Sequence, residues 1–230
     1  MISTSIAAVL RPALAGAAAL GMAAGLAAAT AHAAPGAADP PRGAGTLYGD
    51  PAAAAPFWRY QGYDDDCVEM AVADVVGELT GHRPAERAVI RVAQSTPSTV
   101  HPGPIYTKPK KRKPGSGTSF DDEPALLARY GVHAATTGGG MTALEQDLAN
   151  GRKVIAGVNA ELIWREPVED KTADGKPEAN HAVVVTGVDT AAGIVHLNDS
   201  GDEKGRDERV PIDVFARSWA SSDDQMTVTG

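Results

Sequence analysis

A helical pattern marks residues 67–80, which read Cys67-Val68-Glu69-Met70-Ala71-Val72-Ala73-Asp74-Val75-Val76-Gly77-Glu78-Leu79-Thr80. Gly81 follows directly and is a natural helix stop. Asp66 precedes the segment and can cap it, and Glu69, three residues later, completes the spacing of a capping box. We therefore predict a helix that carries Cys67 in its first turn, where unpaired backbone N–H groups and the helix dipole favour a thiolate.

Cys67 is the only cysteine in 230 residues, so it cannot form an internal disulfide. Composition alone leaves three interpretations open: a reactive thiol, an intermolecular bridge, or a small buried hydrophobic residue. Its place at a helix N-terminus favours the reactive thiol, because cysteines of low pKa prefer such positions. The carboxylates of Asp64, Asp65 and Asp66 oppose ionisation of the thiol unless they point to solvent or act as caps.

The chain after this helix divides into a helical part and a part rich in strands. Apolar runs and turn signals in the second part predict an antiparallel sheet, with a hairpin around the turn at residues 190–193. Thr142 and Glu145 repeat the capping-box spacing and predict the start of a short helix. Helices followed by an antiparallel sheet indicate an α+β fold. Helices are predicted at 84–93, 121–130 and 142–150, and strands at 153–159, 181–189, 194–198 and 226–229.

A thiol nucleophile needs a base, and the base needs a group that orients it. His181 opens the apolar run Ala182-Val183-Val184-Val185, so it lies at the mouth of a buried strand. The next strand ends in Asn198-Asp199, which brings polar side chains to the same edge of the hairpin. Neighbouring strand residues point to opposite faces, so only one of these two can reach His181. We expect it to be Asp199, because a carboxylate both fixes the tautomer and stabilises the imidazolium, with Asn198 as the alternative.

Gln61 lies six residues before Cys67 and the helix that carries it. Further along the chain come the strand His-Ala-Val-Val-Val-Thr-Gly-Val-Asp and the strand Val-His-Leu-Asn-Asp. Together these features resemble the papain-like cysteine peptidases. The chain is most similar to family C thirty-nine, the bacteriocin-processing (double-glycine) peptidases, in their stand-alone branch. The resemblance covers about residues 57–218 and implies a papain-like α+β fold. It also implies that Gln61 and the N–H of Cys67 form an oxyanion hole, that Cys67 attacks, that His181 transfers the proton, and that Asp199 orients the imidazole.

The chain departs from this family at two places beside the expected site. Val68-Glu69 follows the cysteine where family members commonly have Gly-Pro, and Ser200 follows Asp199 where they commonly have Pro. The membrane helices and ATPase of transporter-fused members are absent from the sequence, so specificity for double-glycine leaders is not carried over. The Asp66-Cys67 pair is also similar to NlpC-type cell-wall peptidases, which lack the upstream glutamine.

Two other functions fit the same residues. An amidase, transglutaminase or acyltransferase could use the same triad, because acyl-enzyme chemistry does not fix the acceptor. A secreted binding module on a peptidase-like fold, with an incidental thiol, is the non-catalytic alternative. The residue pattern predicts neither a cofactor nor a metal site, and it predicts a monomer that acts on a peptide or protein substrate.

The N-terminal segment is typical of an export signal. Arg11 is the only charge in residues 1–33, and it precedes an uncharged stretch of Ala, Gly, Leu and Met. Ala31-His32-Ala33 provides small residues for cleavage before Ala34, which predicts a secreted or extracytoplasmic protein. An uncleaved membrane anchor is the alternative. Residues 34–56, rich in Ala, Pro and Gly, predict a disordered linker, and residues 57–230 predict one cysteine peptidase-like domain.

The net charge of −8 argues against nucleic acid as the main partner, because phosphate binding needs a basic field. A basic run interrupts this acidic background inside a loop predicted to be flexible, residues 95–119. The run is either a solvated loop or a contact with an anionic cell surface or an acidic substrate. Its positive residues are Lys108, Lys110, Lys111, Arg112 and Lys113.

Overall fold

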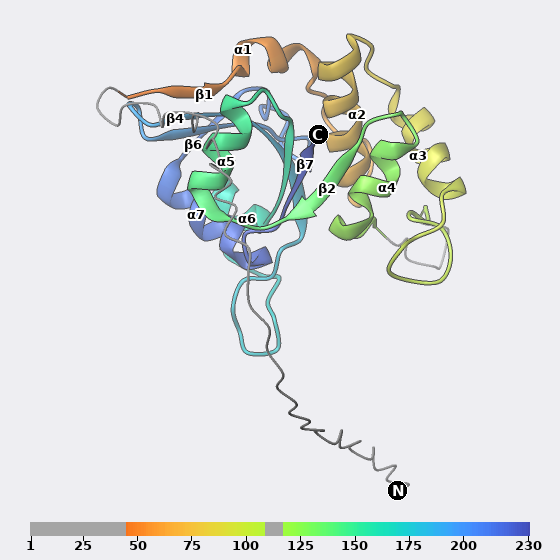
Figure 1. Ribbon diagram of the computed structural model, residues 1–230. Coiled ribbons are helices and arrows are strands. Elements are labelled where there is room, and N and C mark those ends of the chain that lie inside the picture. Colours follow the sequence, from red (N-terminus) through yellow and green to blue (C-terminus); the bar gives the residue numbers. More distant parts are fainter. Residues whose placement is uncertain (1–44, 109–116) are drawn as a thin grey trace, which may run out of the picture. The chain divides into compact units, whose positions relative to one another are not determined.

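The computed structural model describes residues 45–108 and 117–230 (Figure 1). The predicted signal segment, its cleavage point and the basic residues at 110–113 therefore lie outside the described residues. The described helices are α1 (Pro51–Ala54), α2 (Cys67–Thr80), α3 (Glu86–Ser95), α4 (Glu123–Ala128), α5 (Gly140–Ala149), α6 (Ala160–Trp164) and α7 (Ile212–Trp219), with short 3-10 turns at Ala55–Phe57, Phe120–Asp122 and Ala220–Ser222.

The described strands form one antiparallel sheet in the order β2-β7-β3-β4-β5-β6, and β1 pairs with β4 off this path. The predicted hairpin is confirmed, because β4 pairs with β5 directly across the turn at 190–193. Three of the four predicted strands have the expected bounds or nearly so, and β3 is one residue shorter at each end. The strands are β1 (Leu47–Gly49), β2 (Ala134–Thr137), β3 (Val154–Val158), β4 (His181–Asp189), β5 (Ile194–Asn198), β6 (Glu208–Pro211) and β7 (Met226–Thr229).

Two hydrophobic cores lie on opposite faces of the sheet. Figure 1 shows α2, α3 and α4 together on one side and α5, α6 and α7 on the other. Ile155 and Val184 face the core of α2, α3 and α4, whereas Val154, Val183 and Val185 face the core that contains α5 and α7. Both faces of β3 and β4 are therefore covered, which explains why these central strands are apolar at nearly every position.

The packing of α2 on β4 determines where the site forms. Val72 and Val76 of α2 share a core with Ala182 and Val184 of β4. This contact holds the first turn of α2 at the same end of the sheet as His181, the first residue of β4. A residue on the helix and residues on the sheet are thus brought together, as the α+β layout predicts.

Two predictions about the helix starts are wrong. Asp66 is the N-cap residue of α2, but its carboxyl accepts no hydrogen bond from the helix, and Glu69 accepts one from the Thr118 hydroxyl rather than closing a capping box. Helix α5 begins at Gly140, so Thr142 lies inside its first turn and not at its cap. Burial explains the first difference, because Asp66 and Glu69 are both turned into the protein.

The predicted linker is wrong for its last residues. Residues 45–56 are part of the folded body: β1 pairs with β4, and Pro51 and Ala54 of α1 are buried. Asp50 caps α1 by accepting a hydrogen bond from the N–H of Ala53 at 3.0 Å. Composition concealed this segment, because alanine is as compatible with a buried helix as with a linker. In the part of the chain that the structure describes, no helix is long and apolar enough to cross a membrane.

Candidate active site

His181 and Asp199 form a buried pair at one end of the sheet. Nε2 of His181 lies 2.7 Å from Oδ1 of Asp199. The two residues meet because β4 begins at His181 and the neighbouring strand β5 ends immediately before Asp199. Both side chains are almost completely buried, so the interaction is shielded from water and salt.

Asp199 accepts several further hydrogen bonds that fix its position. Its Oδ1 also accepts a hydrogen bond from the N–H of Gly201 at 2.7 Å, and its Oδ2 accepts one from Nε1 of Trp164 at 2.8 Å. Its backbone carbonyl accepts a third from Nε1 of Trp58 at 2.5 Å. The indole of Trp164 also packs against the imidazole of His181, with 5.5 Å between ring centroids. The carboxylate therefore has a single orientation, and so does the imidazole bound to it.

The two groups shift each other's pKa in the directions expected of an ion pair. Burial disfavours the charged imidazole of His181, but the Asp199 carboxylate and the Cys67 side chain outweigh burial and raise the pKa of His181 to about 10. Burial likewise opposes the charge of Asp199, yet His181, Trp164 and Gly201 hold its pKa below the ordinary value. At neutral pH the pair is therefore imidazolium and carboxylate.

Cys67 lies in the first turn of α2 and is partly exposed, as a nucleophile must be. Its side chain interacts with the imidazole of His181. Nε2 of that ring is occupied by Asp199, so Nδ1 is the nitrogen that remains for the thiol. The order thiol, imidazole, carboxylate is the geometry of a nucleophile, a base and an orienting group.

Gln61 is positioned by the residue that follows Asp199. Its backbone N–H donates to the carbonyl of Ser200, and its Oε1 accepts from the Ser200 hydroxyl, each at 2.9 Å. Its Nε2 donates to the carbonyl of Tyr63 at 2.8 Å, which fixes the orientation of the amide because a carbonyl can only accept. The amide nitrogen carries a second hydrogen that this contact leaves available.

The alternative orienting residue, Asn198, points elsewhere. Its Nδ2 donates to Asp74 at 2.9 Å and to the carbonyl of Ala54 at 3.1 Å, so it joins α2 and α1 to the sheet. The structure thus places Asp199, and not Asn198, against His181. His196, also on β5, pairs with Asp207 at 2.6 Å and takes no part in this site.

Buried carboxyls beneath the start of α2 form a contrasting environment. Burial, with contributions from Glu86 and Glu69, raises the pKa of Asp66 to about 8. Burial also raises the pKa of Glu69 to about 7 and that of Glu123 to about 8. Among the described residues, Oε2 of Glu69 and Oε1 of Glu123 have no hydrogen-bond partner. These acids are therefore mostly protonated below pH 7.

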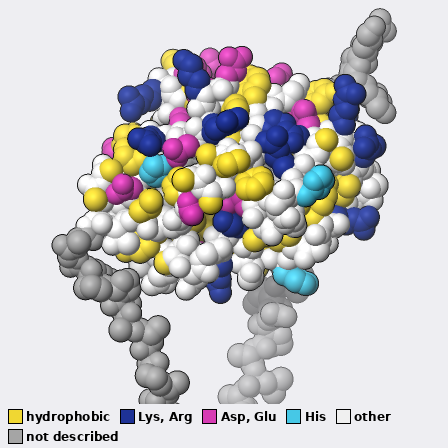
Figure 2. Space-filling view, turned by 90° about the horizontal axis from the view of Figure 1, so that it is seen from above, with side chains coloured by type: hydrophobic (Ala, Val, Ile, Leu, Met, Phe, Trp, Pro, Cys, Tyr) yellow, Lys and Arg dark blue, Asp and Glu magenta, His cyan; other side chains and the backbone are white. Residues whose placement is uncertain are grey.

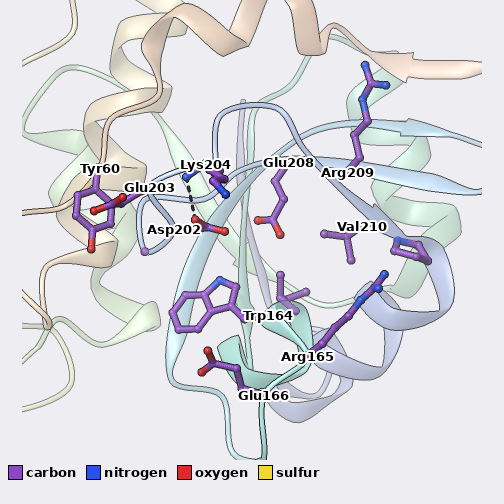
Figure 3. Close-up of a pocket in the computed structure, with 13 residues that line it drawn as sticks. Tyr60, Trp164, Arg165, Glu166, Asp202, Glu203, Lys204, Glu208, Arg209 and Val210 are labelled. Atoms are coloured by element: carbon purple, nitrogen blue, oxygen red, sulfur yellow. Dashed lines mark hydrogen bonds between the residues drawn. The ribbon is translucent and has the colours of Figure 1, made fainter.

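A cavity of about 740 Å³ adjoins the histidine side of the site (Figure 3). Trp164 and Gly201 form its inner wall, and a side chain at Gly201 would come within about 3 Å of the imidazole of His181. Figure 3 shows the carboxyl of Glu208 pointing into this space toward Asp202. Burial and the nearby carboxylates of Asp199 and Asp202 raise the pKa of Glu208 to about 7.

Three residues that position the site were not predicted to do so. No sequence pattern assigned Trp58 or Trp164 to the triad, and Ser200 was noted only as a departure from a family pattern. Each donates a hydrogen bond to Asp199 or Gln61. A usable signal exists for the tryptophans, because a buried indole N–H needs an acceptor and the expected Asp199 is an acceptor. In the described ranges no group of three or more His, Cys, Asp or Glu side chains could hold a metal ion.

Comparison with known proteins identifies the family to which the chain belongs. The chain matches the Peptidase_C39 like family over residues 50–227. Two curated relatives, Uncharacterized protein Mb1299c of Mycobacterium bovis and Uncharacterized protein Rv1268c of Mycobacterium tuberculosis, are each 58% identical over 199 residues, which cover 81% of this chain and 85% of each relative. The fold is similar to that of a Bacillus anthracis protein described as a C39-like peptidase, with a TM-score of 0.58 and 18% identity over 80% of this chain and 98% of that chain.

The chain therefore belongs to the Peptidase_C39 like family, and its helices and antiparallel sheet form the papain-like fold of C39-like peptidases. The resemblance found in the sequence is confirmed for the family and for the fold.

Proposed function

We propose that this protein is an exported cysteine peptidase that hydrolyses a peptide or amide bond through an acyl-enzyme on Cys67. The observation that carries the proposal is the imidazole of His181, which has the Cys67 thiol on one side and the buried Asp199 carboxylate on the other. Membership of the C39-like family supports the reaction class. Export is inferred from the N-terminal segment with its single charge, Arg11, and from the Ala31-His32-Ala33 sequence.

The acylation step follows from these positions. The imidazolium of His181 stabilises a thiolate on Cys67, which attacks the carbonyl carbon of the substrate and forms a carbon–sulfur bond. The C–N bond then breaks, and the proton on Nδ1 of His181 moves to the leaving amine. Asp199 remains ionised throughout and holds the ring so that Nδ1 faces the reacting atoms.

The oxyanion that forms in this step needs donors. The N–H of Cys67 at the start of α2 and the second Nε2 hydrogen of Gln61 are the donors that the proposal assigns to it. The contacts of Gln61 with Ser200 and Tyr63 support this role, because a preorganised donor stabilises developing charge without reorganising. In deacylation a water attacks the thioester, gives one proton to His181, and the carbon–sulfur bond breaks to return the Cys67 thiolate.

A thiol-directed activity probe on the purified chain tests this proposal. We expect the wild type to be labelled at Cys67, and both Cys67→Ala and His181→Ala to lose labelling. Incubation with a peptide mixture, in water and in water with an added primary amine, separates hydrolysis from acyl transfer. Free carboxylic products in both conditions support a peptidase, whereas amine adducts as the main product would assign an acyltransferase. A wild type that neither labels nor cleaves would support the binding-module alternative.

A further inference from the structure

A second cavity, of about 240 Å³, lies between α3 and the segment that precedes α2. Three of its lining residues are cations: Arg87 and Arg91 from α3, and Lys108 from the loop that follows. The other lining residues are Tyr63, Ile90 and Gln94, so the lining contains no carboxylate. The chain as a whole has a net charge of −8, and Figure 2 shows basic and acidic side chains interspersed on one face of the molecule.

The three cations lack an ion-pair partner in the part of the chain that the structure describes. Arg87 and Arg91 are one helical turn apart, a spacing at which like charges repel. In the residues that the structure describes, none of the three makes an ion pair. Residues 109–116 cannot supply a carboxylate from their side chains either, since they read Pro109-Lys110-Lys111-Arg112-Lys113-Pro114-Gly115-Ser116. Among the described residues, the cavity therefore has three cations and no anionic partner for them.

The cavity is connected to the candidate active site through Tyr63. Nζ of Lys108 donates to the hydroxyl of Tyr63 and lies 4.0 Å from the centroid of its ring. The backbone carbonyl of the same tyrosine accepts the hydrogen bond from Nε2 of Gln61. A group bound in the cavity would therefore contact a residue that holds the proposed oxyanion donor in place. This position is suited to a part of the substrate.

We propose that this cavity binds the carboxylate of an aspartate or glutamate side chain in the peptide substrate, so that the enzyme selects acidic peptides. The inference rests on the peptidase function proposed above and names its substrate class. Arginines suit a carboxylate because the guanidinium donates two parallel hydrogen bonds to it. Ile90 and the ring of Tyr63 provide apolar contact for the methylene groups of such a side chain. A cavity of about 240 Å³ is of a size that suits one side chain.

Binding of labelled peptides to the Cys67→Ala protein, which cannot turn them over, tests the site directly. The probes are a fluorescent peptide that contains several glutamates and its glutamine counterpart of equal length. We expect the glutamate peptide to bind more tightly, and the double variant Arg87→Gln/Arg91→Gln to weaken its binding about tenfold. Arg129→Gln is the matched control, because Arg129 is also exposed but lies outside the cavity. Binding of the glutamate peptide that is unchanged in the double variant would overturn the proposal.

Two further measurements distinguish a peptide site from a membrane site and test whether the bound peptide is cleaved. Vesicles of anionic phosphatidylglycerol should not displace the glutamate peptide; displacement that is lost in the Arg87→Gln/Arg91→Gln variant would reassign the site to a membrane surface. Cleavage of the same two peptides by the wild type should show a lower KM for the glutamate peptide, and the double variant should remove this difference. Selective binding without any cleavage would refute the peptidase function and leave the anion site standing.

Discussion

Two groups of buried carboxyls, one at the end of β5 and one in the helical half of the molecule, behave in opposite ways. Asp199, at the end of β5, is buried and yet ionised. Glu123 and Glu69, beneath the start of α2, are equally buried and are protonated up to about pH 7 or 8. The difference lies in the partners: the Asp199 carboxylate accepts hydrogen bonds from His181, Trp164 and Gly201, whereas Glu69 and Glu123 each have an oxygen without a partner.

This comparison shows that burial alone does not set the charge of a carboxyl group. Burial disfavours the charged form in both regions. Hydrogen-bond donors and a neighbouring cation offset this effect only at Asp199. Glu69 and Glu123 are therefore mostly neutral below pH 7, whereas Asp199 and His181 form an ion pair. The side chain of Cys67 therefore contacts an imidazolium, while the buried acids Glu69 and Glu123 of the helical half are mostly protonated below pH 7.

Neutralising one acid in each region should give the largest difference in kcat. Asp199→Asn removes the charge that stabilises the imidazolium of His181, and we expect kcat to fall about 10⁴-fold. Glu123→Gln replaces an acid that is already neutral, so kcat should stay within about twofold of the wild type near pH 6. Asn198→Ala, on the residue beside Asp199, should lose far less than Asp199→Asn. Equal losses of kcat in Asp199→Asn and Asn198→Ala would show that Asp199 does not orient His181.

Gln61→Ala removes the proposed side-chain oxyanion donor and gives the next largest effect. The loss of one such donor typically costs a factor of about 10² to 10³ in kcat. KM should change little, because the contribution appears only when negative charge develops on the substrate oxygen. Alkylation of Cys67 by a halide reagent builds no oxyanion and should remain fast. Full peptidase activity in this variant would refute the oxyanion role.

Stability should fall as the pH rises, because the acids beneath α2 bind protons more tightly in the folded state. Glu69 and Glu123 have folded-state pKa values of about 7 and 8, against an ordinary value of 4.5. From about pH 4.5 upward each can remove up to about 1.4 kcal/mol of unfolding free energy per pH unit, until about pH 7 for Glu69 and about pH 8 for Glu123. Asp199 acts oppositely, but only near and below pH 4, since its pKa is lowered. Denaturant unfolding at pH 5 and pH 8 measures the change, and Glu123→Gln should reduce it. A stability that rises from pH 5 to pH 8 would contradict this account.

Ser200→Ala should give the smallest effect, because it removes one neutral hydrogen bond. The hydroxyl of Ser200 orients the Gln61 amide, and its loss should lower kcat by about tenfold at most, with KM unchanged. Ser200→Thr keeps a hydroxyl and should restore most of the activity. In the Gln61→Ala background, Ser200→Ala should have no further effect, since the group that it orients is gone. Additive losses would mean that Ser200 acts independently of Gln61.

Much of this fold could be predicted from the sequence where local signals were strong. The run from His181 to Asp189 and its hairpin partner have apolar patterns that match β4 and β5 residue for residue. Strands β1 and β6 were missed because each is three or four residues long with few buried side chains. Helix α6, which carries Trp164, was missed because it has only five residues and forms through the Asn159 cap.

The candidate site was predictable in part. Cys67, His181 and Asp199 could be predicted because a lone cysteine at a helix start and a histidine at a strand mouth are local features. The donors that fix Asp199 were not predicted, because Trp58 and Trp164 are 141 and 35 residues away from it in the chain and no local pattern pairs them with it. The failed capping box at Asp66 has the same origin, since tertiary burial replaced a local hydrogen bond.

The rate of Cys67 alkylation as a function of pH tests the central claim most directly. An ordinary thiol with a pKa of about 8.5 is less than about 1% ionised at pH 6, so its rate rises about tenfold per pH unit from pH 6 to 8. If the His181–Asp199 pair stabilises the thiolate, the wild type should alkylate rapidly at pH 6 with a nearly flat profile, and His181→Ala should show the steep rise. A steep wild-type profile that is unchanged in His181→Ala would contradict the account.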